Sequence, residues 1–303
     1  MIPTVAKNPA ETAAWSTRRE LGSAGGLRSA VWLARHLGRP LTRLLILPIC
    51  LGFVLCHPAA RAASRGYLNR ALGRPARLWD IARHFFTFGT TVLDRVYLLN
   101  DEIDRFDITI HGEEIVSDIL ARGQGCLLLG AHHGSFEVLR LIGRNRPDLR
   151  VSLAMYEETG RKIGAALNAI NPHLAPHIIG LGTPGAMIQI KDCLERGGFV
   201  GVLADRTLQT DTPERMPFLG APAPFPTGPQ RLAALLRPQV VLMVGLFRGG
   251  NRYEIHFERL AASEADRPEA SEIARVMDRF VERLECYCRV APYNWFNFFD
   301  FWA

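Results

Sequence analysis

Residues 131–137, Ala-His-His-Gly-Ser-Phe-Glu, place a histidine and a carboxylate on either side of a turn. An apolar run typical of a buried strand leads into His132, and an amphipathic run typical of a helix follows Ser135, which we interpret as its cap. A neutral imidazole can take the proton of an attacking hydroxyl, while a carboxylate holds its tautomer and stabilises the imidazolium. The spacing alone occurs by chance, but its position between a strand end and a helix start makes His132 and Glu137 candidates for this chemistry.

A second polar pair, Asp205-Arg206, follows another apolar run. The carboxyl ends of parallel strands meet at one edge of a sheet, where ligands bind, so we expect this pair near His132. Residues 205–228 then form a long connection rich in Pro, Gly and Thr, and loops of this length in compact domains usually serve function.

The elements that position these residues alternate between strand and helix patterns. The strands are expected at 106–111, 126–130, 151–156, 177–179 and 199–204, and the helices at 113–122, 136–144, 161–170, 186–196 and 229–236. Residues 240–246 and 253–257 are predicted to form a closing hairpin at the edge of the sheet. The pattern indicates an α/β fold, with a largely parallel sheet flanked by helices.

Residues 1–105 differ from the predicted α/β domain at 106–303 in charge. The chain has a net charge of +6, yet residues 1–80 contain 12 Lys and Arg against 3 Asp and Glu. Residues 44–56 are uncharged and have arginines on both sides, which argues against a simple membrane crossing. We expect a helical membrane-anchoring segment that dips into the cytoplasmic leaflet as a hairpin. The alternative is an ordinary buried helix with a basic collar.

Cysteine spacing and the charge pattern bear on cofactors and partners. The six cysteines lack the paired spacing of a zinc site or a disulfide framework, and no phosphate-binding glycine motif is present. We therefore expect no metal and no nucleotide cofactor. The apolar neighbours of the N-terminal arginines favour a membrane surface over nucleic acid.

The turn at 131–137 resembles the H-x4-D/E motif of lysophospholipid acyltransferase-like enzymes, and in particular of bacterial lipid A late acyltransferases. The resemblance spans most of residues 27–303. It includes Ala204-Asp205-Arg206 in place of the family's Pro-Asp-Gln, and the segment 217–228. The aromatic C-terminal segment 293–302 instead resembles the acyltransferases found with aryl polyene or xanthomonadin-type pigments. Its aromatic side chains would either line an acyl tunnel or pack in the core.

The resemblance implies transfer of a fatty or polyenoyl group from an acyl carrier protein or CoA thioester to a hydroxyl of a membrane glycolipid or lipid. It assigns the base to His132 and its partner to Glu137. It also implies action at the cytoplasmic face of a bacterial inner membrane, without a metal or other cofactor. The residues expected to bind substrate are Arg161, Asp205, Arg206, Phe218, Gly220, Thr227 and Gly228.

Two other functions remain compatible with these residues. A thioesterase or hydrolase would use the same site if water entered where the acceptor binds. A non-enzymatic, basic membrane-associated scaffold would depend on the N-terminal arginines and not on His132.

Overall fold

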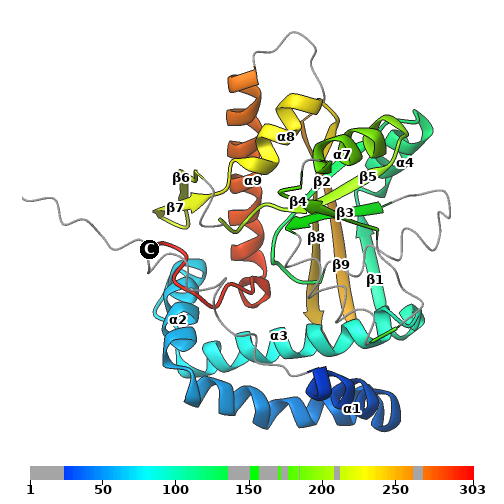
Figure 1. Cartoon of the computed structure of the whole chain (residues 1–303). Helices are drawn as coiled ribbons and strands as arrows, with labels where there is room; N and C mark the ends of the chain where they lie inside the picture. Colours follow the sequence, from blue (N-terminus) through cyan, green and yellow to red (C-terminus); the bar gives the residue numbers. More distant parts are fainter. Residues whose placement is uncertain are drawn as a thin grey trace, which may run out of the picture.

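The computed structural model describes residues 24–135, 151–156, 170–171, 177–183, 185–207, 212–261 and 269–303. The N-terminal part contains three helices, α1 Ala24–Cys56, α2 Pro58–Leu72 and α3 Leu78–Leu98 (Figure 1). The elements that follow are β1 Asp107–His111, α4 Glu113–Ala121, β2 Cys126–Gly130, β3 Val151–Tyr156, β4 His177–Leu181, α7 Ala186–Glu195, β5 Phe199–Leu203, β6 Glu214–Phe218, β7 Ala221–Phe225, α8 Gly228–Leu236, β8 Gln239–Gly249, β9 Arg252–Ala261 and α9 Glu269–Val290.

The main sheet has the strand order β1-β9-β8-β2-β5-β3-β4. Strands β8, β2, β5, β3 and β4 are parallel to one another, and β9 and β1 run in the opposite direction. All five residues of β2 are buried, as an apolar strand covered on both faces requires. Leu127 and Leu129 pack in one apolar cluster and Cys126 and Leu128 in another, so both faces of the sheet carry a core. The expected α/β fold with a largely parallel sheet is confirmed.

The hairpin formed by β8 and β9 was expected at the edge of the sheet, and that placement is wrong. Strand β1 pairs with β9 in parallel register and covers its outer side. The backbone groups that an edge strand would leave unpaired are thereby satisfied on β9. The predicted strand at 106–111 exists, but it runs against the central strands and not along them.

The connection 205–228 is also more ordered than the sequence suggested. It contains the two-stranded antiparallel ribbon β6–β7, in which Pro217 is paired with Pro222. Proline has no backbone N–H to donate. Within sheets it is therefore confined to edge strands or to positions where no hydrogen bond from that nitrogen is required. The proline content that predicted an irregular loop is compatible with a short, separate ribbon.

Helix α1 lies alongside α3 over much of its length (Figure 1). It bends at Gly38, whose φ of 73° is non-helical, two residues before Pro40. Few residues of α1 are buried, and the part from Val31 to Cys56 is long and apolar enough to cross a membrane. The alternative of an ordinary buried helix is therefore not supported, and α1 is a candidate membrane anchor.

An ion pair attaches α1 to the rest of the molecule. Arg39 donates to both oxygens of Asp94 on α3, at 2.7 and 2.8 Å, and to the carbonyl of Gly250 in the turn between β8 and β9, at 2.6 Å. Asp94 is fully buried and also accepts a hydrogen bond from Tyr253 of β9. Loss of one partner of such a buried pair costs about 3–5 kcal/mol, because the other charge is left buried without a counter-ion.

Candidate active site

His132 and Asp205 follow the carboxyl ends of two neighbouring parallel strands. β2 ends at Gly130 and β5 at Leu203, and these two residues are partners in the β2–β5 register. The Nδ1 atom of His132 lies 2.8 Å from Oδ1 of Asp205, and the backbone N–H of His132 donates to Oδ2 at 3.0 Å. The expectation that the pair at 205–206 lies near His132 is thus met by a direct contact.

The carboxylate of Asp205 has no exposed surface and accepts hydrogen bonds from four donors. Two come from His132, and Trp295 Nε1 and Asn297 Nδ2 supply the others, each 3.0 Å from Oδ2. Burial alone would raise the pKa of Asp205, but the contacts with His132 and the charge of Arg206 hold it well below its usual value. Asp205 is therefore ionised, and an ionised acceptor at Nδ1 requires a proton on that nitrogen.

His132 then carries its basic lone pair on Nε2. Its side chain is 28% exposed, so the ring can meet a bound molecule. Burial is the main cause that lowers its pKa, the charges of Arg206 and Arg95 lower it further, and Asp205 opposes the shift. The imidazole is consequently neutral at pH 7 and able to accept a proton, as a general base must be.

The backbone after His132 is held in a turn that only glycine fits. Gly134 has a φ of 72°, and a Cβ on it would lie 1.7 Å from the carbonyl oxygen of Gly245. Its N–H donates to the carbonyl of Asn294, the N–H of Ser135 donates to the carbonyl of Gly245, and the carbonyl of His132 accepts from the N–H of Phe296. The turn that carries His132 is thus fixed between β8 and the C-terminal segment.

The aromatic C-terminal segment serves as packing around Asp205 in this structure. Trp295 is completely buried against Phe218, Tyr67 and Phe301, while its indole N–H reaches Asp205. Sequence reasoning noted the aromatic residues but missed the part played by Trp295, Asn297 and Asn294. The one signal in the sequence was that two asparagines, Asn294 and Asn297, interrupt an otherwise aromatic run.

Arg206 is anchored beside the pair. Its Nε donates to Asn297 Oδ1 at 2.7 Å and its Nη2 donates to the carbonyl of Phe296 at 3.0 Å. The positive charge of Arg95 on α3 also lowers the pKa of His132, and no pattern in the sequence had singled out this arginine. Two guanidinium groups within electrostatic range of the base favour an anionic group on whatever binds there.

His133 has different surroundings from His132. Its ring is buried and lies edge-on to Tyr287 of α9, and burial lowers its pKa to about 3. Its ring is therefore neutral at pH 7.

The remaining predicted residues occupy several places. Phe218 is buried and lies behind Trp295, and Gly220 lies in the turn between β6 and β7 with a φ of 82°. Thr227 precedes Gly228 at the start of α8 and donates to the carbonyl of Thr212. Among the described contacts, none joins these four residues directly to His132. Glu137 and Arg161 lie outside the described residues.

Comparison with known protein families gives one match. Residues 81–302 match the family described as bacterial lipid A biosynthesis acyltransferase. The matched region includes α3, the main sheet, His132, Asp205 and the C-terminal segment. A comparison with curated proteins found no match.

Replacement of Asp205 by asparagine tests the assignment of the pair. The three donors at Oδ2 would hold the amide oxygen of the introduced side chain in their place, so its NH2 group would face Nδ1 of His132. That orientation reverses the tautomer and removes the lone pair from Nε2. We expect turnover to fall roughly 10³–10⁴-fold in Asp205→Asn, measured with single-turnover kinetics.

The control for this substitution is Asp300→Asn, at a carboxylate that contacts only the nearby backbone of Trp302 in the described contacts. It should leave turnover unchanged. A folded Asp205→Asn protein with more than about a tenth of the wild-type rate would contradict the assignment.

The pH profile tests the part played by Arg206. Since the positive charge of Arg206 lowers the pKa of His132, its removal raises that pKa, and the ring keeps its proton to higher pH. We expect the acidic limb of kcat/KM, where activity is lost as pH falls, to move to higher pH in Arg206→Gln. Arg215→Gln, at an exposed arginine on β6, should leave the limb in place. An unchanged limb in Arg206→Gln would show that this charge does not act on the base.

Proposed function

The chain belongs to the bacterial lipid A biosynthesis acyltransferase family, and on this premise we propose that it moves a fatty or polyenoyl group from a thioester to a hydroxyl of a glycolipid or lipid. The proposed donor is an acyl carrier protein, with CoA as the alternative carrier. The single observation that carries the mechanism is the contact between His132 Nδ1 and the buried carboxylate of Asp205, which leaves Nε2 basic.

In the proposed reaction, Nε2 of His132 takes the proton of the acceptor hydroxyl while the oxygen attacks the thioester carbonyl carbon. The tetrahedral intermediate collapses, the C–S bond breaks, and the thiolate leaves and takes the proton from the imidazolium. The products are an ester and a free thiol. Asp205 stabilises the imidazolium electrostatically and keeps the ring in its productive orientation.

Glu137 remains part of the proposal as a partner of His132. In the structure Nδ1 is already engaged by Asp205, so Glu137 would contribute through a different contact. Asp205, which was expected among the substrate-binding residues, is better placed to orient His132, because its carboxylate is buried beneath four donors.

Basic residues would bind the phosphate or sugar side of the acceptor. Arg206 lies beside the base, and Arg161 is retained as a second candidate. Phe218 would act indirectly, by supporting Trp295 behind the carboxylate. Gly220, Thr227 and Gly228 belong to the ribbon and the start of α8 and are proposed to shape the approach to the site.

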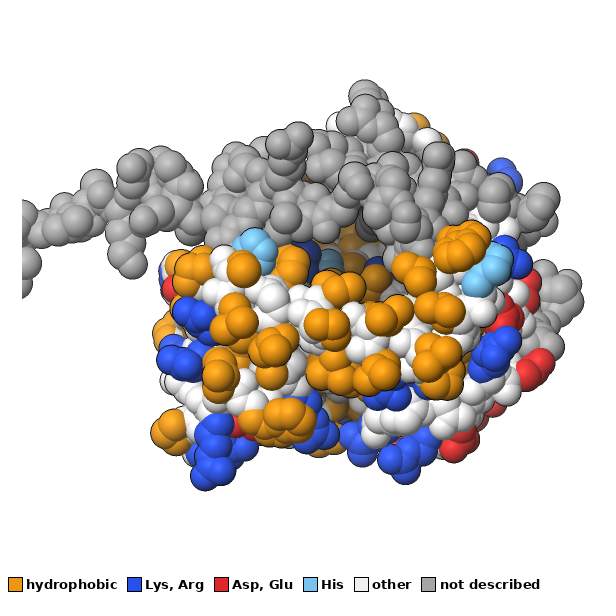
Figure 2. All heavy atoms as spheres, turned by 90° about the horizontal axis from the view of Figure 1, so that it is seen from below, with side chains coloured by type: hydrophobic (Ala, Val, Ile, Leu, Met, Phe, Trp, Pro, Cys, Tyr) orange, Lys and Arg blue, Asp and Glu red, His pale blue; other side chains and the backbone are white. Residues whose placement is uncertain are grey.

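We also propose that the protein works on the cytoplasmic face of a bacterial inner membrane. Figure 2 shows hydrophobic side chains spread over the lower face, with Lys and Arg around their margin, and a hollow at its border in which basic and histidine side chains are visible. The exposed large apolar residues of α1 and of the start of α3 are Trp32, Leu37, Leu41, Leu44, Leu45, Leu47, Ile49, Leu51, Leu55, Leu78 and Trp79. An apolar helix face flanked by arginines suits a lipid surface with anionic headgroups.

The proposed function is tested by transfer of a labelled acyl group from carrier protein to extractable lipid. In membranes that contain wild-type protein, label is expected in lipid, and its chemical form identifies the acceptor. In His132→Ala, transfer should be lost while the protein stays membrane-bound. Equal labelling of lipid by both proteins would refute the role of His132, and thioester cleavage without labelled lipid would favour a hydrolase.

Membrane attachment is tested by a matched pair of substitutions. Ile49 on α1 and Ile188 on α7 are both 64% exposed. Burial of one such side chain in lipid is worth about 1.5–3 kcal/mol, so Ile49→Glu should weaken binding to anionic vesicles by at least about tenfold. Ile188→Glu should have no comparable effect. Equal behaviour of the two variants in a flotation assay would argue against α1 as the lipid-binding surface.

A further inference from the structure

Three side chains with metal-binding atoms converge on the outer strands of the main sheet. They are His111 at the end of β1 and Glu254 and His256 of β9. One ligand atom from each lies within 4.8 Å of the other two. We propose that they bind a divalent transition-metal ion of the Zn²⁺ type.

The strand register brings these residues together. His111 is the direct partner of His256 in the parallel β1–β9 ladder, so the two side chains project from the same face of the sheet. Glu254 lies two residues before His256 and therefore projects from that face as well. The cluster is a consequence of backbone pairing and does not depend on flexible loops.

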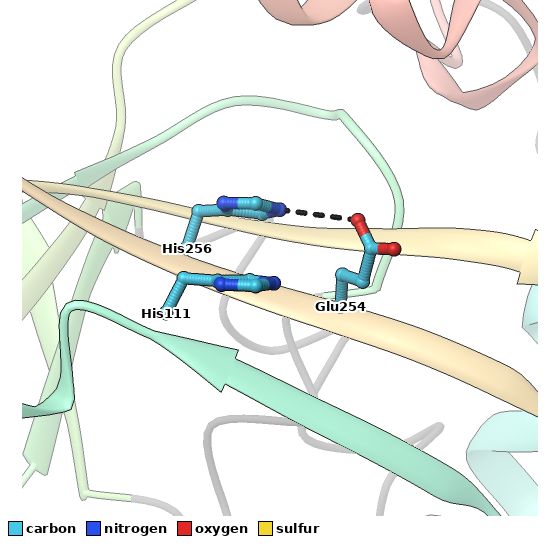
Figure 3. A group of neighbouring side chains, drawn as sticks. All are labelled: His111, Glu254 and His256. Carbon is cyan, nitrogen blue, oxygen red and sulfur yellow. Dashed lines mark hydrogen bonds and ion pairs between the residues drawn. The ribbon is translucent and has the colours of Figure 1, made fainter.

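The side chains are oriented toward a common point. Figure 3 shows the two imidazole rings stacked, with a nitrogen of each directed toward the carboxylate of Glu254. The ring centroids are 4.5 Å apart, and Nε2 of His256 lies 3.4 Å from Oε2 of Glu254. Zinc binds imidazole nitrogen and carboxylate oxygen at about 2.0–2.2 Å in tetrahedral geometry, so two ligand atoms on one ion lie roughly 3.4 Å apart. The distance between His256 and Glu254 already fits this geometry, and rotation of the His111 side chain would complete the three ligands.

Neighbouring residues hold two of the ligands in place. Arg248 donates to Oε1 of Glu254 at 3.1 Å, which leaves Oε2 on the side of His256. Gly112, directly after His111, has a φ of 77°, and a Cβ on it would lie 2.2 Å from the carbonyl oxygen of Phe257. This close approach fixes the end of β1 against β9. A ligand oriented by a further hydrogen bond is typical of metal sites in proteins.

The ion would have a structural role. β1 is an edge strand, and an ion shared between β1 and β9 would fasten this edge to the sheet. β1 runs opposite to β2, so the carboxyl end of β1 lies at the other end of the sheet from the turn that carries His132. The site is therefore separate from the proposed chemistry and does not rest on the proposed function.

The experiment measures zinc binding to untagged, chelator-treated full-length protein by isothermal titration calorimetry. We expect His111→Ala and His256→Ala each to weaken the zinc affinity by about 100-fold or more. His177→Ala is the matched control, because His177 is an exposed strand histidine on β4, the opposite edge of the sheet. It should bind zinc as the wild type does.

Thermal unfolding gives an independent measurement. Zinc at a concentration well above its dissociation constant should raise the Tm of the wild type and of His177→Ala, and should leave the Tm of both ligand variants unchanged. Uptake of zinc that is equal in all four proteins, or no uptake by the wild type at about 100 µM zinc, would overturn the proposal.

Discussion

The buried carboxylate of Asp205 is the constraint on which the structure around His132 depends. An ionised carboxylate excluded from water is tolerated only when donors meet its lone pairs. Here the donors come from the turn after β2 and from the C-terminal segment, while Asp205 itself follows β5. Some of the contacts that solvate this charge also orient His132, so local stability and the orientation of the imidazole have the same origin.

The C-terminal segment completes the site in a second way. The carbonyl of Asn294 accepts from the N–H of Gly134, and its side chain exchanges hydrogen bonds with the backbone of Phe247 on β8. Asn294 thus joins the turn after β2 to β8, in addition to the hydrogen bond from Ser135 to Gly245.

The sequence predicted those parts of the fold that depend on local pattern. The bounds of β2 and β3 followed from apolar runs, and His132 and Asp205 were both placed at strand ends. The contact between them could not be predicted, because 73 residues separate them and the histidine had a nearer carboxylate in Glu137. The opposite direction of β1 and the ribbon β6–β7 escaped prediction for a related reason. Strand direction is decided by tertiary pairing, which alternation along the chain does not encode.

The ion pair between Arg39 and Asp94 has a consequence for motion. It joins α1 to α3 and to the β8–β9 turn, so these contacts oppose independent movement of α1 and the sheet. If α1 lies on a bilayer, as proposed, the protein keeps two translations and one rotation in the plane of the lipid. The search for an acceptor in the same membrane then becomes two-dimensional, and the orientation of α1 on the surface sets the orientation of the turn that carries His132.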